Sequence, residues 1–375
     1  MKRNQIYSWV MGAAMSAALA FTCVSCDEES TGNEGGNTFE NIVDQTKAQA
    51  AVEAYVDKTV VPTYKDMLDK VTIMHTVVTT FLSNKTQANL DAACTAWREA
   101  REPWEESEAF LYGPAEYENL DPSLDSWPLE MTEINAILEN KNWGAVEGES
   151  EAAFGVRGFH TLEYLLFNEG QPRDASTVKD EEIQYTKIVT ERLLKDTETL
   201  YYAWSKDGAV DKYSTCFGNE FKQHNTDRFG SLAVVIGQIF DGCIDIAGEV
   251  GDAKIGEPYN KYKTNKEEGV LAVESWYSWN SLKDYTDNIV SIENSYLGGI
   301  EGDRGTSLSE LVKSVNPDAD QNLKDAIDNA KTMINKIPAP FRSNLTSNAE
   351  IEAAMDACAN LSDALTQAKG ALKLD

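Results

Sequence analysis

From residue 39 onward, apolar side chains recur three and four positions apart, the spacing of one face of an α-helix. The segment from Val52 to Val60 is a clear example. We find no alternation of period two long enough for a sheet, and the Pro- and Asp-rich stretch 116–128 predicts a loop. The pattern predicts helices over residues 39–84, with a kink or break at Pro62, and over 86–112, 129–140, 149–167, 178–204, 225–250, 271–297, 317–337 and 348–372.

Eight or nine helices joined by mostly short loops predict an all-α protein of two packed four-helix-bundle-type domains. The most loop-like central stretch, residues 169–177, separates a bundle over residues 39–170 from a second one over 171–375. An internal duplication is one interpretation, because Ser107–Gly113 and Ile292–Gly298 share a Glu-to-Gly spacing at the end of a helical pattern. Chance similarity is the alternative.

The first 26 residues have the pattern of an export signal. Lys2 and Arg3 precede an apolar run that is too short for a comfortable transmembrane helix. The run ends in Cys23-Val24-Ser25-Cys26, which resembles a bacterial lipobox. We expect a lipoprotein signal peptide over residues 1–25, lipidation at Cys26 and a tether over 26–38. The chain would then be exported and anchored to the outer membrane of the cell envelope by lipid alone; a plain secretory signal is the alternative.

Composition and charge narrow the classes of partner. The 375 residues are 42% hydrophobic and 25% charged, as in a globular protein, and the net charge is −29. A surface so acidic repels phosphate backbones, so we expect no nucleic-acid partner. Cys94, Cys216, Cys243 and Cys358 are scattered and form no disulfide framework. We expect Cys94 and Cys358 to be buried among alanines.

The segment from Gly155 to Phe167 is apolar around its whole axis, as in a helix buried between others. His160 and Glu163 are three positions apart and therefore project from one face. Such a pair can supply two ligands to a transition metal. The alternative is a hydrogen-bonded pair that only sets the register of the helix.

The helical segment 97–108 places Trp97, Arg101, Trp104 and Glu108 on one inward stripe. The other charged residues of this segment, Arg98, Glu99, Glu102, Glu105 and Glu106, are expected in solvent. Arg101 and Glu108 could simply pair with each other. Alternatively, Glu108 joins His160 and Glu163 in a three-ligand metal site, and Arg101 holds a carboxylate or an anionic ligand.

The Gly158-x-His160-x-x-Glu163 pattern resembles the GxHxxE signature of the imelysin family, also described as insulin-cleaving membrane protease-like proteins. Further segments resemble that family in the same order, namely WREAREPWEESEAFLYGP (97–114), DSWP (125–128), Gly248–Gly251 with Lys254-Ile255 and Pro258 in the segment 248–258, ESWYSWNS (274–281) with Asn288-Ile289, and Pro340-Phe341. The resemblance covers residues 39–372. It implies two packed four-helix bundles, with a functional site near their interface, in an envelope protein associated with iron.

When the family's site residues are transferred to the matching positions, the resemblance places His160 and Glu163 in the functional site. Glu108, Arg101 and Asp125 follow from their motifs, and Trp97, Trp127, Glu274 and Ser275 are candidates for ligand binding or for support of the ligands.

Three functions remain open at this stage. The first is binding of a metal ion, iron above all, or of an iron-bearing small ligand for uptake, with an envelope transport partner. The second is a metallopeptidase that cleaves extracellular peptides. However, Tyr164 stands where an HxxEH zinc motif needs its second histidine, so the residues favour a binding protein over an enzyme. The third is a structural envelope lipoprotein with a buried His–Glu pair.

Overall fold

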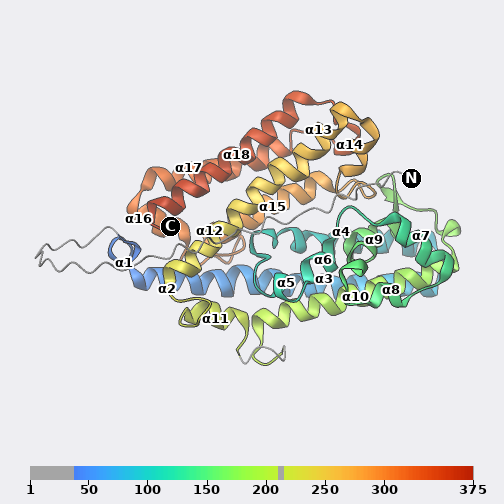
Figure 1. Ribbon diagram of the computed structural model, residues 1–375, viewed down its shortest axis with the longest axis horizontal. Coiled ribbons are helices and arrows are strands. Elements are labelled where there is room, and N and C mark those ends of the chain that lie inside the picture. The colour runs from blue at the N-terminus through green and yellow to red at the C-terminus, as the bar shows by residue number, and fades with distance from the viewer. Residues whose placement is uncertain (1–37, 210–214, 375) are drawn as a thin grey trace, which may run out of the picture. The chain divides into compact units, whose positions relative to one another are not determined.

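The computed structural model describes residues 38–209 and 215–374, and it is built almost entirely from helices (Figure 1). The only strands in this part are the two-residue β1 (Phe167–Asn168) and β2 (Gln171–Pro172), which pair antiparallel. The predicted all-α class is confirmed. The signal peptide, the tether up to Asn37 and the lipidation site Cys26 lie outside the described residues.

The first half contains three long helices, α3 (Val61–Ser83), α4 (Gln87–Glu105) and α10 (Asp180–Ser205). Shorter helices precede, connect or follow them: α1 (Phe39–Ile42) and α2 (Gln45–Ala54) before α3, then α5 (Pro114–Tyr117), α6 (Leu120–Asp125), α7 (Met131–Asn140), α8 (Gly144–Glu147) and α9 (Gly158–Leu166) between α4 and α10, and α11 (Phe217–Gln223) after α10. The helix predicted over 149–167 is an α-helix only from Gly158 onward. A 3₁₀ segment, Glu151–Val156, precedes it.

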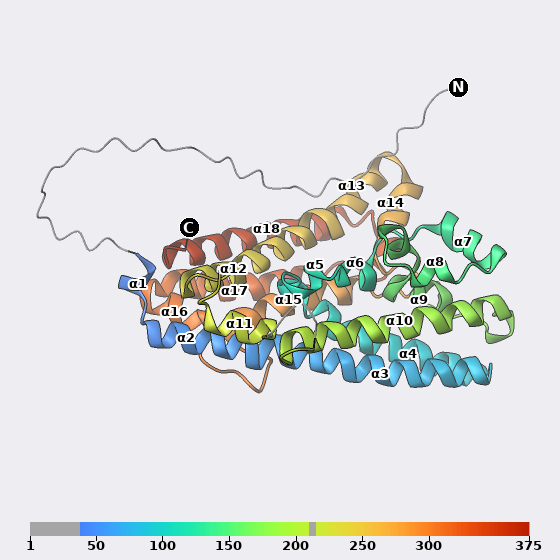
Figure 2. The ribbon, with the colours of Figure 1, turned by 60° about the horizontal axis from the view of Figure 1, so that its bottom comes forward.

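The second half contains α12 (Leu232–Glu249), α13 (Glu257–Thr264), α14 (Lys266–Ala272), α15 (Ser281–Leu297), α16 (Leu308–Val315), α17 (Pro317–Ile334) and α18 (Asn348–Ala371). α17 packs against α18, α18 against α12, and α15 against both α12 and α17. These helices run beside one another in both views (Figures 1 and 2).

Two helices continue through a π-helical segment just before a proline. Tyr55–Val60 joins α2 to α3 ahead of Pro62, and Val250–Gly256 joins α12 to α13 ahead of Pro258. A proline has no N–H for the i−4 carbonyl and its ring clashes there, so a locally wider turn lets the helix continue. The sequence pattern ended the second of these helices at Val250. The structure instead extends it to Thr264, and this extension carries Lys254.

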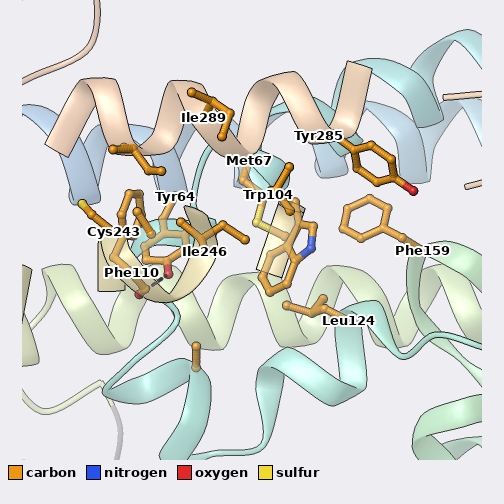
Figure 3. Close-up of a cluster of buried hydrophobic side chains, with 14 of the residues drawn as sticks. Tyr64, Met67, Trp104, Phe110, Leu124, Phe159, Cys243, Ile246, Tyr285 and Ile289 are labelled. Atoms are coloured by element: carbon orange, nitrogen blue, oxygen red, sulfur yellow. Dashed lines mark hydrogen bonds between the residues drawn. The ribbon is translucent and has the colours of Figure 1, made fainter. Parts of the chain in front are cut away.

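The two halves share a continuous apolar core. Tyr64 and Met67 of α3 and Trp104 of α4 lie in one cluster with Ile246 of α12 and Ile289 of α15 (Figure 3). All described residues accordingly belong to one compact unit. The predicted boundary at residue 170 separates α10 from α3, yet these two helices pack against each other. The division into two bundles and the duplication stay predictions.

The four cysteines at 94, 216, 243 and 358 are free and buried, as expected for Cys94 and Cys358. Among the described helices, none combines the length and the apolar character needed to cross a bilayer.

Candidate functional site

Helix α4 carries the polar centre of the molecule on its buried face. Trp97, Arg101 and Trp104 are all fully buried, as their spacing predicts. The Trp97 indole N–H donates to the Phe159 carbonyl at 3.0 Å, which ties α4 to the start of α9. An arginine side chain in such a position needs acceptors, because a buried charge without partners is very unfavourable.

The end of α4 differs from the sequence-based prediction. The α-helix stops at Glu105 rather than Tyr112, and Glu108 opens a 3₁₀ turn, Glu108–Phe110. Glu105 was expected in solvent and is fully buried. Helix α15 covers this flank of α4, and Asn288 donates its Nδ2 to Glu105 Oε2 at 2.6 Å. The period of a single helix cannot reveal a flank that a second helix covers.

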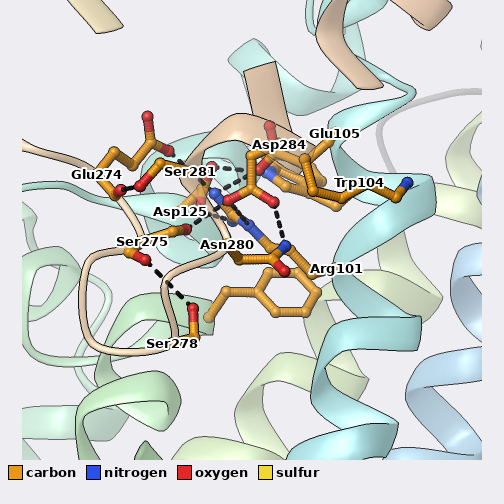
Figure 4. Close-up of polar contacts among 12 residues, drawn as sticks. Arg101, Trp104, Glu105, Asp125, Glu274, Ser275, Ser278, Asn280, Ser281 and Asp284 are labelled. Carbon is orange, nitrogen blue, oxygen red and sulfur yellow. Dashed lines mark hydrogen bonds and ion pairs between the residues drawn. The ribbon is translucent and has the colours of Figure 1, made fainter. Parts of the chain in front are cut away.

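Four carboxylates surround the Arg101 guanidinium (Figure 4). Nη1 pairs with Asp125 and Nη2 with Glu105, Nη2 also reaches Glu274 Oε1 at 3.0 Å, and Nε lies 3.5 Å from Asp284 Oδ2. Burial alone would lower the pKa of Arg101, but these carboxylates raise it well above the usual value. Arg101 is therefore permanently charged, and it holds together α4, α6, α15 and the loop before α15.

His160 of α9 contacts carboxylates on both ring nitrogens. Nδ1 lies 3.0 Å from Glu163 Oε2, and Nε2 lies 3.2 Å from both Asp125 Oδ1 and Glu274 Oε1. Glu163 is itself fixed, because its Oε1 accepts the backbone N–H of Ser278 at 2.7 Å. Burial and Arg101 lower the pKa of His160, but Asp125 and Glu163 outweigh them and raise it well above the usual value.

Gly158, the first residue of the GxHxxE pattern, starts α9 with φ +84°. A Cβ at this position would lie 2.3 Å from the Leu124 carbonyl oxygen, which belongs to α6. The glycine therefore permits both the left-handed backbone and the close approach of α6. Because Asp125 follows Leu124, this contact brings Asp125 to His160.

The loop between α14 and α15 supplies the remaining site residues. The sequence pattern predicted one helix over 271–297, but the chain leaves the helix after Ala272 and re-enters it at Ser281. Ser275 and Trp279 take positive φ values of 52° and 61°, which no helix contains. Trp279 stacks on Gly170, where a Cβ would come within 2.3 Å of the indole. The loop thereby turns Glu274 toward Arg101 and His160.

The remaining predicted residues lie around this centre. The Ser275 hydroxyl donates to Asp284. The Trp127 ring lies 4.8 Å from the His160 ring, centroid to centroid, and its indole N–H donates to the Ala272 carbonyl at 3.3 Å. Both residues therefore support the loop and the histidine.

Glu108 points to a second cation, Lys254, whose Nζ lies 3.4 Å from Glu108 Oε1 and 3.5 Å from Glu274 Oε2. Burial raises the pKa of Glu105 and of Glu108 well above the usual value, although Arg101 and Lys254 act in the opposite direction. Burial also acts to raise the pKa of Glu274, but Lys254 and His160 lower it to about 2. Glu274 is thus the firmly ionised member of this group.

Within the described part of the chain, three groups of side chains could each offer three ligand atoms within 4.8 Å of one another. They are Asp125–His160–Glu274, Glu105–Glu108–Asp125 and Glu102–Glu106–Asp287. The structure brings His160 and Glu163 together as predicted from their spacing. It places Glu108 in the second group, beside Lys254, while Asp125 and Glu274 complete the first.

The third group gives a testable pH dependence. Burial and the neighbouring Glu102 raise the pKa of Glu106 to about 7. The folded state then binds a proton that the unfolded state releases, so the free energy of unfolding falls as pH rises toward 7. We expect Glu106→Gln to stabilise the protein at pH 8 by on the order of 2 kcal/mol, or roughly 3 °C in Tm, and to have little effect at pH 5.

The matched control is Glu99→Gln, an exposed position on α4, which ends just before Glu106. Thermal melts of both variants at pH 5 and pH 8 give the comparison. An equal effect of Glu106→Gln at the two pH values would contradict the assignment.

The sequence model of the imelysin family matches residues 60–368. This chain belongs to the imelysin family. Iron-regulated protein A of Synechococcus elongatus is 28% identical over 335 residues, which are 88% of this chain and 86% of that protein. The chain is thus an imelysin with an iron-regulated relative, and the resemblance seen in its motifs is confirmed.

Solved structures agree with this assignment. A putative iron-regulated protein A precursor from Parabacteroides distasonis is 38% identical, with a TM-score of 0.85, and the match covers 89% of this chain and 99% of that one. An imelysin-like protein from Psychrobacter arcticum shares only 13% identity, with a TM-score of 0.64 over 86% of this chain and 94% of that one. That second similarity concerns the fold alone.

Several residues of this site were not predicted from the sequence. Glu105 and Asp284 carry no pattern of their own, because each becomes buried only when α15 packs on α4. Asn288 had a signal, since it lies in the family-like pair Asn288-Ile289. Lys254 had a signal, since it lies within the family-like segment 248–258, yet it was not selected as a site residue. The remaining two histidines, His75 and His224, lie outside the three metal-ligating groups described above.

Proposed function

We propose that this protein binds a transition metal ion, with iron as the candidate, through Asp125 Oδ1, His160 Nε2 and Glu274 Oε1. The observation that carries the proposal is the convergence of one imidazole nitrogen and two carboxylate oxygens within 4.8 Å. One nitrogen with two oxygens suits iron or manganese better than a structural zinc site rich in Cys and His.

Glu163 supports His160 as a metal ligand by contacting its other ring nitrogen. Histidines that bind metals commonly donate the other ring N–H to a carboxylate, which fixes the tautomer and the orientation of the ring. Here Glu163 contacts Nδ1 at 3.0 Å and is held by the Ser278 N–H, so Nε2 faces the two carboxylates. The predicted pair His160 and Glu163 then contributes one ligand and its support, rather than two ligands.

The carboxyl groups of the buried cluster outnumber its bases. The bases are Arg101, Lys254 and His160, and the pKa of each is raised above its usual value. They face six carboxyl groups, those of Glu105, Glu108, Asp125, Glu163, Glu274 and Asp284. Burial raises the pKa of Glu105, Glu108 and Asp284, so a bound divalent ion would replace protons on the cluster.

Arg101 contacts the proposed metal ligands, so its guanidinium must move when an ion binds. Its Nη2 lies 3.3 Å from His160 Nε2 and 3.0 Å from Glu274 Oε1, so a metal ion in this position displaces Nη2 from Glu274. The ion then shares Asp125 Oδ1 with Nη1, while Glu105 still holds the guanidinium. The four carboxylates around Arg101 favour, as a second candidate, a structural network that only fixes the contact of α4 with α15.

Thermal melts of the protein without its first 26 residues distinguish the two functions. We expect Fe²⁺ or Mn²⁺ at about 100 times its Kd to stabilise the metal-free protein by about 2.7 kcal/mol, or roughly 4 °C. His160→Ala combined with Glu274→Gln should lose the shift, and the matched control His75→Ala should keep it. The absence of a shift with Fe²⁺, Fe³⁺, Mn²⁺, Zn²⁺ and Ca²⁺ would overturn the proposal and leave the structural network.

We also propose that Cys26 is lipidated and tethers the protein to the cell envelope, where it would take part in iron uptake with a transport partner. The support is the lipobox-like sequence before Cys26 and the iron-regulated relatives. Cys26→Ser should move the protein from the membrane fraction to the soluble fraction. Unchanged fractionation would contradict lipid anchoring at this residue.

A further inference from the structure

Glu274 faces two separate positions with its two carboxylate oxygens. Oε1 lies 3.2 Å from His160 Nε2 in the proposed metal position, and Oε2 lies 3.5 Å from Lys254 Nζ. The same ammonium lies 3.4 Å from Glu108 Oε1 and 3.9 Å from Glu105 Oε2. Glu274 therefore bridges the metal position and a neighbouring position that Lys254 fills.

The neighbouring position has its own set of ligand atoms. One oxygen each from Glu105, Glu108 and Asp125 lie within 4.8 Å of one another. Asp125 also belongs to the metal position, so the two positions share Asp125 as well as Glu274. Carboxylates that bridge two cations are the means by which two-metal sites hold ions only about 3.5–4 Å apart.

Two buried side-chain oxygen atoms near this second position have no hydrogen-bond partner in the described part of the chain. Asn288 is fully buried, and its Nδ2 donates to Glu105 Oε2, while its Oδ1 has no hydrogen-bond partner in the described part of the chain. The Tyr285 hydroxyl is also buried without such a partner there. Among the charges that act on it are those of Glu274, Lys254 and Glu105. Buried oxygen atoms without partners are rare, and a side-chain amide oxygen such as Asn288 Oδ1 is a ligand type that hard cations take.

The ammonium fits this position loosely. Its three contacts of 3.4–3.9 Å are longer than the 2.7–2.9 Å of a close charge-assisted hydrogen bond. Lys254 is nonetheless buried, and it lies on the π-helical segment Val250–Gly256 that turns it toward the cluster. An ammonium and a small divalent cation are alternatives for such a position, because both satisfy the same carboxylates.

We propose that the centre has the plan of a two-cation site in which the Lys254 ammonium takes the place of the second metal ion. The inference rests on the proposed function for the first position. Lys254 thereby limits the wild-type protein to one metal ion.

The stoichiometry of Mn²⁺ binding tests this plan. We expect one Mn²⁺ per wild-type chain by titration calorimetry, and two per chain in Lys254→Ala and in Lys254→Gln, with the paramagnetic resonance spectrum of coupled Mn²⁺ ions. The Gln variant keeps a donor for the carboxylates and so carries the test if the Ala variant does not fold. The matched control is Lys331→Ala, which removes a lysine paired with Glu293 and Asp328 and should leave one ion per chain.

The outcomes separate this inference from the proposed function. One ion in the wild type and one in both Lys254 variants would overturn the inference and leave the proposed function standing. Two ions in the wild type, coupled or not, would have the same meaning. No ion in the wild type would overturn the proposed function and, with it, the inference that rests on it.

Discussion

Arg101→Met is expected to lower the free energy of unfolding by about 3–5 kcal/mol, or roughly 5 °C in Tm. The substitution fills much of the same volume but removes the cation that Asp125, Glu105, Glu274 and Asp284 share. Breaking a buried ion pair from one side is costly because the remaining charges have no partner and no water. Thermal and urea denaturation at pH 7 measure the loss.

A surface arginine provides the control for this variant. Arg304 pairs with Glu293 at 3.3 Å and is about a third exposed, so Arg304→Met should cost less than about 1 kcal/mol. Mn²⁺ should restore part of the stability that Arg101→Met loses, because the ion replaces the missing positive charge. A loss as small as that of Arg304→Met would show that Arg101 is not the cation that balances this cluster.

Gly158→Ala is expected to destabilise the protein by about 3 kcal/mol, or roughly 4 °C. Two effects act together, since φ is +84° and the new Cβ would lie 2.3 Å from the Leu124 carbonyl oxygen. The backbone of α9 or α6 must move to relieve the contact, which separates His160 from Asp125. We therefore expect the variant to lose the Mn²⁺-dependent shift in Tm as well as stability.

Gly237→Ala is the matched control for a glycine-to-alanine change. Gly237 lies inside α12 with nothing within 4 Å of an added Cβ. Alanine should stabilise this helix by up to about 1 kcal/mol and leave metal binding unchanged. Equal behaviour of the two variants would contradict the role given to Gly158.

Local sequence patterns predicted most of the helices because each amphipathic helix carries its own period. The expected helices over 178–204 and 348–372 match α10 and α18 to within two residues. The predicted helix over 271–297 was wrong between Ala272 and Ser281. Residues of that stretch have acceptable helix propensity, and only the packing of Trp279 on Gly170 and the contacts of Glu274 favour the loop.

The site residues likewise divide into those that helical spacing predicts and those that only packing between helices places. The stripe of Trp97, Arg101 and Trp104 and the pair His160 and Glu163 follow from helical spacing, so the sequence alone indicates an inward arginine and a buried His–Glu pair. Lys254 and Glu105 could not be placed this way. Their roles depend on which flank of one helix is covered by another, which no single-helix period contains.

The sequence by itself determined the all-α class, the positions of most helices, the family and the two helices that carry Arg101 and His160. Only the tertiary structure decided that Asp125 and Glu274 face His160 Nε2, that Glu108 lies with Lys254, and that Glu105 is buried. The physical reason is the range of the interactions. Helix formation and amphipathicity act over a few residues, whereas burial of charge depends on segments more than a hundred residues apart that meet in the folded chain.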